Sequence, residues 1–179
     1  MSPSSLPGDD SAAAGHRVWR LGANVDTDAL APGHAMKFGM DVIARHCLES
    51  MRPEFAAQVR PGDVVVAGPG FGIGSSREQA ASVLVALGVR AVIAPSYSGL
   101  YFRNAFNVGL LLLTCPAVAA LQEGERIGLA VDDPDQPQVR AADGRMLACD
   151  PVPAFLMARV RAGGLLNELK QRFSKESHV

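Results

Sequence analysis

The chain has 179 residues, of which 48% are apolar and 20% charged, and its formal net charge is -1. A chain of this length corresponds to about one domain and buries about 70% of its unfolded surface without help from disulfides or metals. The apolar share excludes an intrinsically disordered chain, which is less hydrophobic and more highly charged. The balance of acidic and basic residues argues against a broad nucleic-acid interface.

Three cysteines, Cys47, Cys115 and Cys149, stand far apart and form no C-x-x-C pair. We therefore expect a reducing, cytoplasmic compartment. We also expect that this chain by itself holds neither an iron–sulfur cluster nor structural zinc.

Neither a membrane span nor a secretory signal is expected. The longest apolar stretch, 108–113, is far shorter than the about 20 residues that cross a bilayer. Residues 1–16 lack the basic flank and the apolar core of a signal peptide and are expected to form a disordered tail. One domain is expected over 17–179.

From residue 18 the chain alternates between apolar runs and helical faces. Strands are expected at 18–21, 64–67, 89–94 and 110–113, and helices at 40–48, 75–87 and 99–107. The turn-rich segment 22–33 is expected to lack regular structure. The alternation predicts a parallel sheet flanked by helices.

Beyond residue 116 the pattern changes to short strands joined by tight turns. Strands are expected at 125–131, 138–141 and 146–149, as an antiparallel portion or a small barrel, and helices at 155–161 and 165–173. The sequence therefore predicts an α/β fold, with a parallel strand–helix core and a small additional β portion.

Four alternating glycines, Gly68, Gly70, Gly72 and Gly74, lie between a predicted buried strand and a predicted helix. Glycine lets the backbone approach a ligand closely, and a helix start offers unpaired N–H groups, so this loop predicts an anion site. The spacing does not match the dinucleotide motif G-x-G-x-x-G, and the lysine of a Walker loop is missing. A pyrophosphate cradle is therefore disfavoured.

Ser75, which follows these glycines, has two interpretations. Ser75-Ser-Arg-Glu78 has the spacing of a capping box, in which the serine caps the predicted helix. Alternatively, Ser75 is a proton acceptor whose alkoxide is stabilised by the helix start and by the guanidinium of Arg77. Arg77 can also hold a carboxylate with two parallel hydrogen bonds.

Four segments carry a family resemblance. The sequence reads Asn24-Val-Asp-Thr-Asp-Ala29, Gly70-Phe-Gly-Ile-Gly-Ser-Ser-Arg-Glu-Gln-Ala80, Ala91-Val-Ile-Ala-Pro-Ser-Tyr97 and Asn104-Ala-Phe-Asn-Val-Gly109. In this order the segments resemble the small subunits of the 3-isopropylmalate dehydratases, in the aconitase family. The resemblance extends from residue 18 to residue 170.

The resemblance implies a swivelling β/β/α domain that caps a separate large subunit. In that family three cysteines of the large subunit hold a [4Fe–4S] cluster, so the cofactor is expected on the partner and not on this chain. The implied activity is that of a hydro-lyase acting on a hydroxylated dicarboxylic acid. The leading hypothesis is the isomerisation of 3-isopropylmalate to 2-isopropylmalate through isopropylmaleate, in leucine biosynthesis.

The resemblance also implies roles for individual residues. Ser75 matches the serine that removes the proton beside a carboxylate, and Arg77 matches the arginine that binds the substrate. Ser76 lies at the same predicted helix start and is expected to bind substrate as well. Asp28 matches an aspartate that lines the site.

The next loop departs from the family pattern. Where members that act on isopropylmalate often read Pro-Gly-Arg-Tyr-Leu-Arg-Thr, this chain reads Pro32-Gly-His-Ala-Met-Lys-Phe38. That loop touches the variable part of the substrate in the family, so Lys37 is expected to bind substrate with a charge but without a planar fork. Dimethylmalate, citramalate and homoaconitate therefore stay open as substrates beside isopropylmalate.

Two hypotheses lie outside enzyme catalysis. The chain could be a free-standing anion- or nucleotide-binding domain that uses the same helix start, or a regulatory or RNA-binding module. The near-neutral charge counts against the RNA-binding module. For the enzyme, the expected partners are the large subunit and a small dicarboxylate, with neither nucleic acid nor membrane.

The histidines and two polar residues of the helix predicted at 99–107 complete the candidate residues. His16, His46 and His178 are expected at the surface, without partners or metal-ligand spacing. His34 either faces the substrate or is solvated. Arg103 and Asn104 are expected to tie their helix to the glycine loop.

Overall fold

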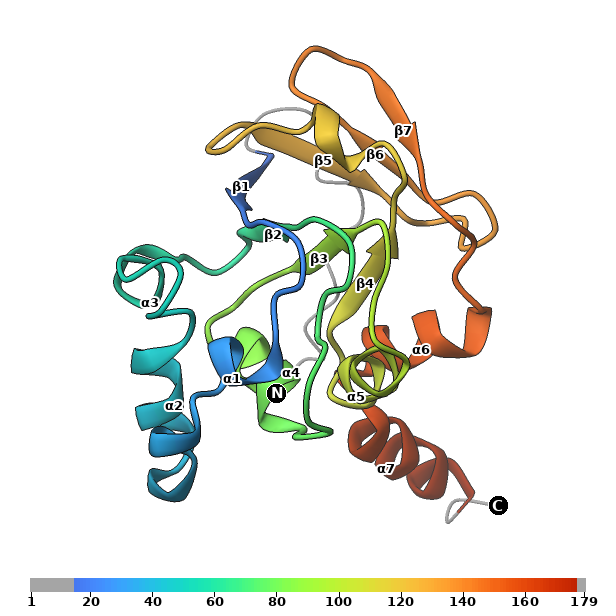
Figure 1. The fold of residues 1–179 in the computed structure, drawn as a ribbon. Coiled ribbons are helices and arrows are strands. Elements are labelled where there is room, and N and C mark those ends of the chain that lie inside the picture. The colour runs from blue at the N-terminus through green and yellow to red at the C-terminus, as the bar shows by residue number, and fades with distance from the viewer. Residues whose placement is uncertain (1–14, 177–179) are drawn as a thin grey trace.

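One mixed β-sheet runs through the structure, a computed structural model that describes residues 15–176 (Figure 1). Its strands are β1 (His16–Arg20), β2 (Val64–Val66), β3 (Ala91–Ala94), β4 (Leu111–Thr114), β5 (Arg126–Ala130), β6 (Gln138–Arg140) and β7 (Met146–Ala148). They lie in the order β4-β3-β2-β1-β5-β6-β7. β1 to β4 pair in parallel, whereas β5 pairs antiparallel with β1 and continues into β6 and β7. The predicted α/β fold with a parallel core is confirmed.

The helices connect and cover the strands. They are α1 (Thr27–Leu30), α2 (Met40–His46), α3 (Phe55–Gln58), α4 (Gln79–Ala86), α5 (Gly99–Asn107), α6 (Ala154–Ala162) and α7 (Leu165–Glu176), with the 3-10 helices η1 (Gly33–Phe38) and η2 (Val118–Ala120). α4 contacts α1, α2 and α5, and α5 in turn contacts α6 and α7 (Figure 1). Within the described residues, no helix combines the length and the apolar character that crossing a membrane requires.

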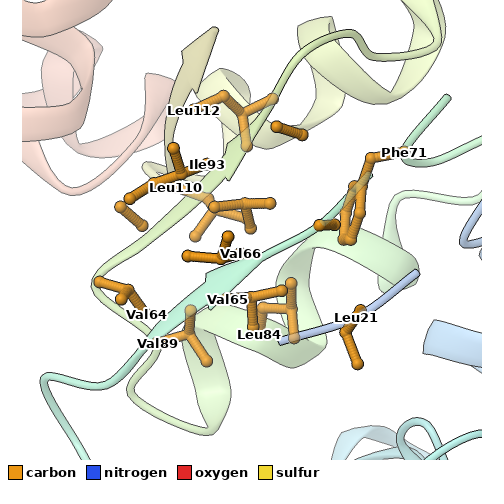
Figure 2. Packing of buried hydrophobic residues seen from close by; sticks show 14 of the residues in the cluster. Leu21, Val64, Val65, Val66, Phe71, Leu84, Val89, Ile93, Leu110 and Leu112 are labelled. Carbon is orange, nitrogen blue, oxygen red and sulfur yellow. The ribbon is translucent and has the colours of Figure 1, made fainter. Parts of the chain in front are cut away.

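The parallel half of the sheet carries the hydrophobic core. β2 and β3 are buried on both faces, as their β-branched and apolar residues predict. Figure 2 shows Val65 and Ile93 among these side chains, together with Leu84 from α4 and Phe71 from the glycine loop. Each fully buried aliphatic side chain contributes about 1.5–3 kcal/mol, so this half is the main source of stability.

The antiparallel half is buried on one face only. Each strand has one buried residue, Ile127 in β5, Val139 in β6 and Leu147 in β7, and its neighbours on either side are more exposed. This period of two is typical of a sheet with one solvated face. The expected antiparallel portion is confirmed, and it extends the main sheet through the pairing of β5 with β1.

Several predictions of local structure are wrong. The helix predicted over 40–48 ends at His46, and Leu48, with a φ of +59°, lies outside it. The segment 22–33 contains the helical turn α1, because the Asp26 carboxylate accepts a hydrogen bond from the backbone N–H of Ala29 at 2.7 Å and caps that turn. The helix predicted from residue 75 begins only at Gln79. His16, expected to end the N-terminal tail, is the first residue of β1, and the rest of that predicted tail, 1–14, lies outside the described residues.

A buried carboxylate ties β1 to the turn before β2. Asp63 is 6% exposed and accepts hydrogen bonds from Arg17 Nε at 3.1 Å and Nη2 at 2.6 Å, from Trp19 Nε1 at 2.8 Å and from the backbone N–H of Arg60 at 2.9 Å. Burial opposes ionisation of Asp63, but these hydrogen bonds outweigh it and hold the pKa of Asp63 below its usual range. Trp19 is thereby fixed in the core, where it is 4% exposed.

We expect Asp63→Asn to lower the free energy of unfolding at neutral pH by about 2–3 kcal/mol. This is less than the usual cost of breaking a buried ion pair, because Arg17 is partly exposed. A carboxyl whose pKa is lowered by folding stabilises the protein above its unfolded pKa of about 3.9 and loses that effect as the pH falls through the folded value. The difference between parent and variant should therefore vanish in acid. Urea denaturation at several pH values measures it. Asp132→Asn, in an exposed turn, is the control, and equal losses in both variants would contradict the assignment.

Candidate active site

The candidate site begins at α1, whose Thr27 side chain is 2% exposed. Thr27 Oγ1 accepts a hydrogen bond from the backbone N–H of Ser75 at 3.0 Å and lies 3.2 Å from Ser75 Oγ, where either hydroxyl can donate. The backbone N–H of Thr27 donates to the carbonyl of Ile73 at 2.8 Å. The two segments are therefore joined side by side, and Ser75 is held against α1.

Two glycines of the loop are required by this close approach. Gly74 has a φ of +108°, and a Cβ built on it would lie 2.9 Å from Thr27 Oγ1. Gly72 has a φ of +81°, and its Cβ would lie 2.2 Å from the ring carbon Cγ of Tyr101. Only glycine fits positions that combine a positive φ with so little space. These two glycines therefore allow the backbone to approach other parts of the protein, Tyr101 and Thr27, and not a ligand as the sequence predicted.

Arg77 connects Ser75 to α1. Its Nε donates to Ser75 Oγ at 2.7 Å, and its Nη1 donates to the carbonyl of Ala31 at 2.7 Å and to Asp28 Oδ1 at 3.3 Å. Nη2 makes no hydrogen bond to any described residue, so it is the nitrogen that can bind a carboxylate without disturbing this arrangement. Asp28 Oδ1 also accepts from the backbone N–H of Gly33 at 3.0 Å.

The capping-box interpretation of Ser75 is wrong. α4 begins at Gln79 with Glu78 as its N-cap residue, and no side chain caps it. Ser75 to Arg77 are not helical, because their polar groups bond to residues far away in the sequence. The N–H of Ser75 donates to Thr27, and the carbonyl of Ser76 accepts from Asn104. The prediction that the helix start itself stabilises a Ser75 alkoxide therefore fails, and the guanidinium of Arg77 is the positive group beside the hydroxyl.

The structure thus brings together Ser75, Arg77 and Asp28. Ser76 is next to them and exposed. The predicted tie is confirmed for Asn104, whose Nδ2 donates to the carbonyl of Ser76 at 2.9 Å, but Arg103 makes no hydrogen bond to the glycine loop within the described residues. Lys37 is on the neighbouring helix η1 and exposed, with its Nζ 5.0 Å from the ring centroid of Phe38. No contact joins Lys37 to the Ser75 network within the described residues.

Thr27 is the residue that sequence reasoning missed. It lies in the middle of the Asp-Thr-Asp motif, yet nothing in the local pattern distinguishes it from a turn residue. Its partner Ser75 is 48 positions away. The family motif itself was the available signal, because it joins this segment to the glycine loop.

His46 and His34 differ from expectation. His34 Nε2 lies 2.7 Å from Glu49 Oε1, and His46 Nδ1 lies 2.6 Å from Glu49 Oε2. His34 therefore has a hydrogen-bond partner, but it does not bond to Ser75 or Arg77. His46, expected to have no partner, contacts both Glu49 and the ring of His34. Hydrogen bonds to His46 and His34 hold the pKa of Glu49 below its usual range. His178 lies outside the described residues, and His16 Nδ1 donates to the carbonyl of Gly62 at 2.7 Å.

Comparison with known proteins places these features in a family. The Aconitase C-terminal domain family matches residues 47–118, which contain the glycine loop and α4. The 3-isopropylmalate dehydratase small subunit of Thermodesulfovibrio yellowstonii is 37% identical over 162 residues, covering 89% of this chain and 95% of that relative. The methanogen homoaconitase small subunit of Methanothermobacter thermautotrophicus is 41% identical over 153 residues, covering 84% and 87%.

A solved structure agrees with these relatives. The crystal structure of 3-isopropylmalate dehydratase from Methanocaldococcus jannaschii superimposes with a TM-score of 0.84 at 32% identity, covering 92% of this chain and 98% of that one. The chain belongs to the family of 3-isopropylmalate dehydratase small subunits. The resemblance in the four sequence segments is thereby confirmed, and so is the aconitase-type fold.

The cysteines of this chain are not placed to bind a [4Fe–4S] cluster. Cys47, Cys115 and Cys149 are all free thiols in the core, at most 8% exposed. A hydrogen bond from the Cys149 thiol lowers the pKa of Cys115. No three cysteines converge among residues 15–176, so the ligand set for a cluster is not in this part of the chain.

We expect Thr27→Val to lower the free energy of unfolding by about 1–3 kcal/mol, because the substitution keeps the shape but leaves the N–H of Ser75 without its acceptor. Urea denaturation of the isolated chain measures the change. Thr114→Val, the same substitution in β4, is the matched control. A Thr27→Val variant as stable as the parent would show that this hydroxyl does not hold the glycine loop against α1.

Proposed function

We propose that this chain is the small subunit of a hydro-lyase that isomerises 3-isopropylmalate to 2-isopropylmalate through isopropylmaleate. The observation that carries the proposal is the arrangement of Ser75, Arg77 and Asp28 in a member of this family. The reaction removes a proton from a carbon beside a carboxylate and hydroxide from the adjacent carbon, and later adds both back with the positions exchanged. This chain supplies the groups for the proton and for a carboxylate.

Ser75 is the proposed proton acceptor. A serine hydroxyl is a weak base in water, so its ionised form needs stabilisation at the site. Arg77 Nε, 2.7 Å from Ser75 Oγ, supplies a positive donor, and Thr27 Oγ1 at 3.2 Å is a second group that can donate. Both donors are already oriented before substrate arrives, which is how preorganised hydrogen bonds stabilise an oxyanion.

Arg77 is the proposed carboxylate-binding residue. Its Nη2 makes no hydrogen bond to a described residue, whereas Nε and Nη1 donate to Ser75, Ala31 and Asp28. A substrate carboxylate bound at Nη2 would therefore lie beside the Ser75 hydroxyl that takes the neighbouring proton. Asp28 keeps the guanidinium in this orientation, and we propose that it lines the site in this way. Ser76, exposed next to Ser75, offers a further hydroxyl to the substrate.

The small-subunit relatives support a large subunit as partner. We propose that this partner carries the [4Fe–4S] cluster, since the described cysteines of this chain do not fit one. The three free thiols agree with a reducing, cytoplasmic compartment. Anaerobic reconstitution of the isolated chain should leave it colourless, and coexpression with a candidate large subunit should give the active enzyme.

A homoaconitase-type activity is the alternative, because a homoaconitase small subunit is among the relatives. The two substrates differ in one group: an isopropyl group against an arm that ends in a third carboxylate. η1 presents both kinds of contact, with the cation of Lys37 and the exposed ring of Phe38. The apolar side chains of Met36 and Phe38 flank this single charge, and apolar contacts suit an alkyl group, which favours isopropylmalate.

We expect Ser75→Ala to lower kcat of the assembled enzyme by about 10²- to 10⁴-fold, the usual contribution of a positioned acid or base. Steady-state isomerisation of 3-isopropylmalate measures it, and circular dichroism and gel filtration check folding and assembly. Ser82→Ala, in α4, is the matched control. Parental turnover by a folded, assembled Ser75→Ala enzyme would exclude the proposed role of this hydroxyl.

We expect Lys37→Met to distinguish the two substrates. Loss of a charge-assisted hydrogen bond costs about 1.5–3 kcal/mol, so kcat/KM for homoaconitate should fall about 10- to 150-fold, and kcat/KM for isopropylmalate much less. Lys170→Met, on the exposed face of α7, controls for the loss of a surface charge. Equal losses on both substrates would mean that η1 does not select between them.

A further inference from the structure

Three side chains with metal-ligand chemistry converge outside the Ser75 network. His34 comes from η1, His46 is the last residue of α2, and Glu49 follows in the next turn. The two carboxylate oxygens of Glu49 each face one imidazole, at 2.7 Å from His34 Nε2 and 2.6 Å from His46 Nδ1. The two imidazole rings meet edge to face, with their centroids 4.9 Å apart.

The donor set matches one class of ion. One ligand atom from each residue lies within 4.8 Å of the other two. Ligands that bond one zinc ion at about 2.0–2.2 Å lie within about 4.4 Å of one another, so small side-chain rotations suffice. Two imidazole nitrogens and one carboxylate oxygen are typical ligands of zinc and related divalent transition metals, and they leave a coordination position open to water.

The backbone places two of the ligands before any ion binds. Leu48, between His46 and Glu49, is buried and has a φ of +59°, which is unusual for a leucine. Its N–H donates to the carbonyl of Ala29 in α1 at 2.8 Å. This bond holds the reversed turn, which returns Glu49 to the side of His46. The backbone position of Glu49 is therefore set by the contact of this turn with α1.

We propose that His34, His46 and Glu49 bind one divalent transition-metal ion of the zinc type, which ties η1 to the end of α2. The cysteine-based expectation that this chain lacks a zinc site does not apply to such a set, because no thiol is needed. The ion is distinct from an iron–sulfur cluster, and its binding can be measured whether or not the proposed isomerase activity is correct.

Such an ion would act on the segment that flanks the candidate site. η1 begins at Gly33, whose N–H donates to Asp28, and it continues to Lys37 and Phe38. Without metal, η1 is held to α2 at this point by hydrogen bonds between exposed or half-buried groups, and such pairs contribute little. Coordinate bonds to His34 would restrain η1 more strongly and so fix the position of Lys37.

Titration of the full chain, free of any affinity tag, with zinc chloride tests the site. Isothermal titration calorimetry should give one equivalent of bound Zn²⁺. His34→Gln, His46→Gln and Glu49→Gln should each weaken binding by at least about tenfold, the effect expected from loss of a contact that supports or makes a metal bond. His16→Gln, which removes a histidine of β1 outside the cluster, should bind as the parent does. Circular dichroism checks that each variant is folded.

Two further measurements separate a built site from an adventitious ion. Cobalt(II) in place of zinc should give the visible absorption of a four- or five-coordinate centre, lost in the three variants. Hydrogen–deuterium exchange at residues 33–38 should slow when zinc is added to the parent and not to His34→Gln. The proposal is overturned if no zinc binds, if several ions bind equally to parent and variants, or if exchange at 33–38 is unaffected by bound zinc.

Discussion

The hydrogen bonds between the Thr27 hydroxyl and Ser75 are the contact on which the rest of the candidate site depends. They join two segments that are 48 positions apart and that approach so closely that a Cβ at Gly74 would lie 2.9 Å from the Thr27 oxygen. A buried hydroxyl and a backbone N–H satisfy each other there, so neither carries the cost of an unpaired polar group. The loop is extended at Ser75 for this reason, and α4 starts one turn later.

α1 is a single turn, yet it supports both of the sites discussed above. Asp28 orients Arg77 and the start of η1, and the carbonyl of Ala31 accepts a further bond from Arg77. The carbonyl of Ala29 holds the reversed turn at Leu48 that carries Glu49 beside the histidines. A helix this short has little stability of its own, so it is fixed by these tertiary bonds and by the Asp26 cap. Movements of α1 would therefore reach both sites.

The division of polar and apolar structure explains how the fold supports chemistry at its edge. The strands β2, β3 and β4 bury almost all of their side chains, and together with the buried face of α4 they form a rigid support (Figure 2). Ser75, Ser76 and Lys37 are exposed on the segments that connect these elements. An exposed hydroxyl with the catalytic role proposed for Ser75 suits a subunit whose partner completes the site, because docking of the partner can then exclude water from it.

The sequence by itself determined the strand–helix alternation, the extent of α5 at 99–107, the antiparallel portion and the family, because these depend on local periodicity and on contiguous motifs. Only the tertiary structure decided the start of α4, the role of Thr27 and the grouping of His34 with His46 and Glu49. The capping-box spacing of Ser75 was satisfied in sequence, but its hydroxyl found partners in Thr27 and Arg77 instead. Side chains choose among hydrogen-bond partners across the whole fold, and a local pattern contains only the nearby ones.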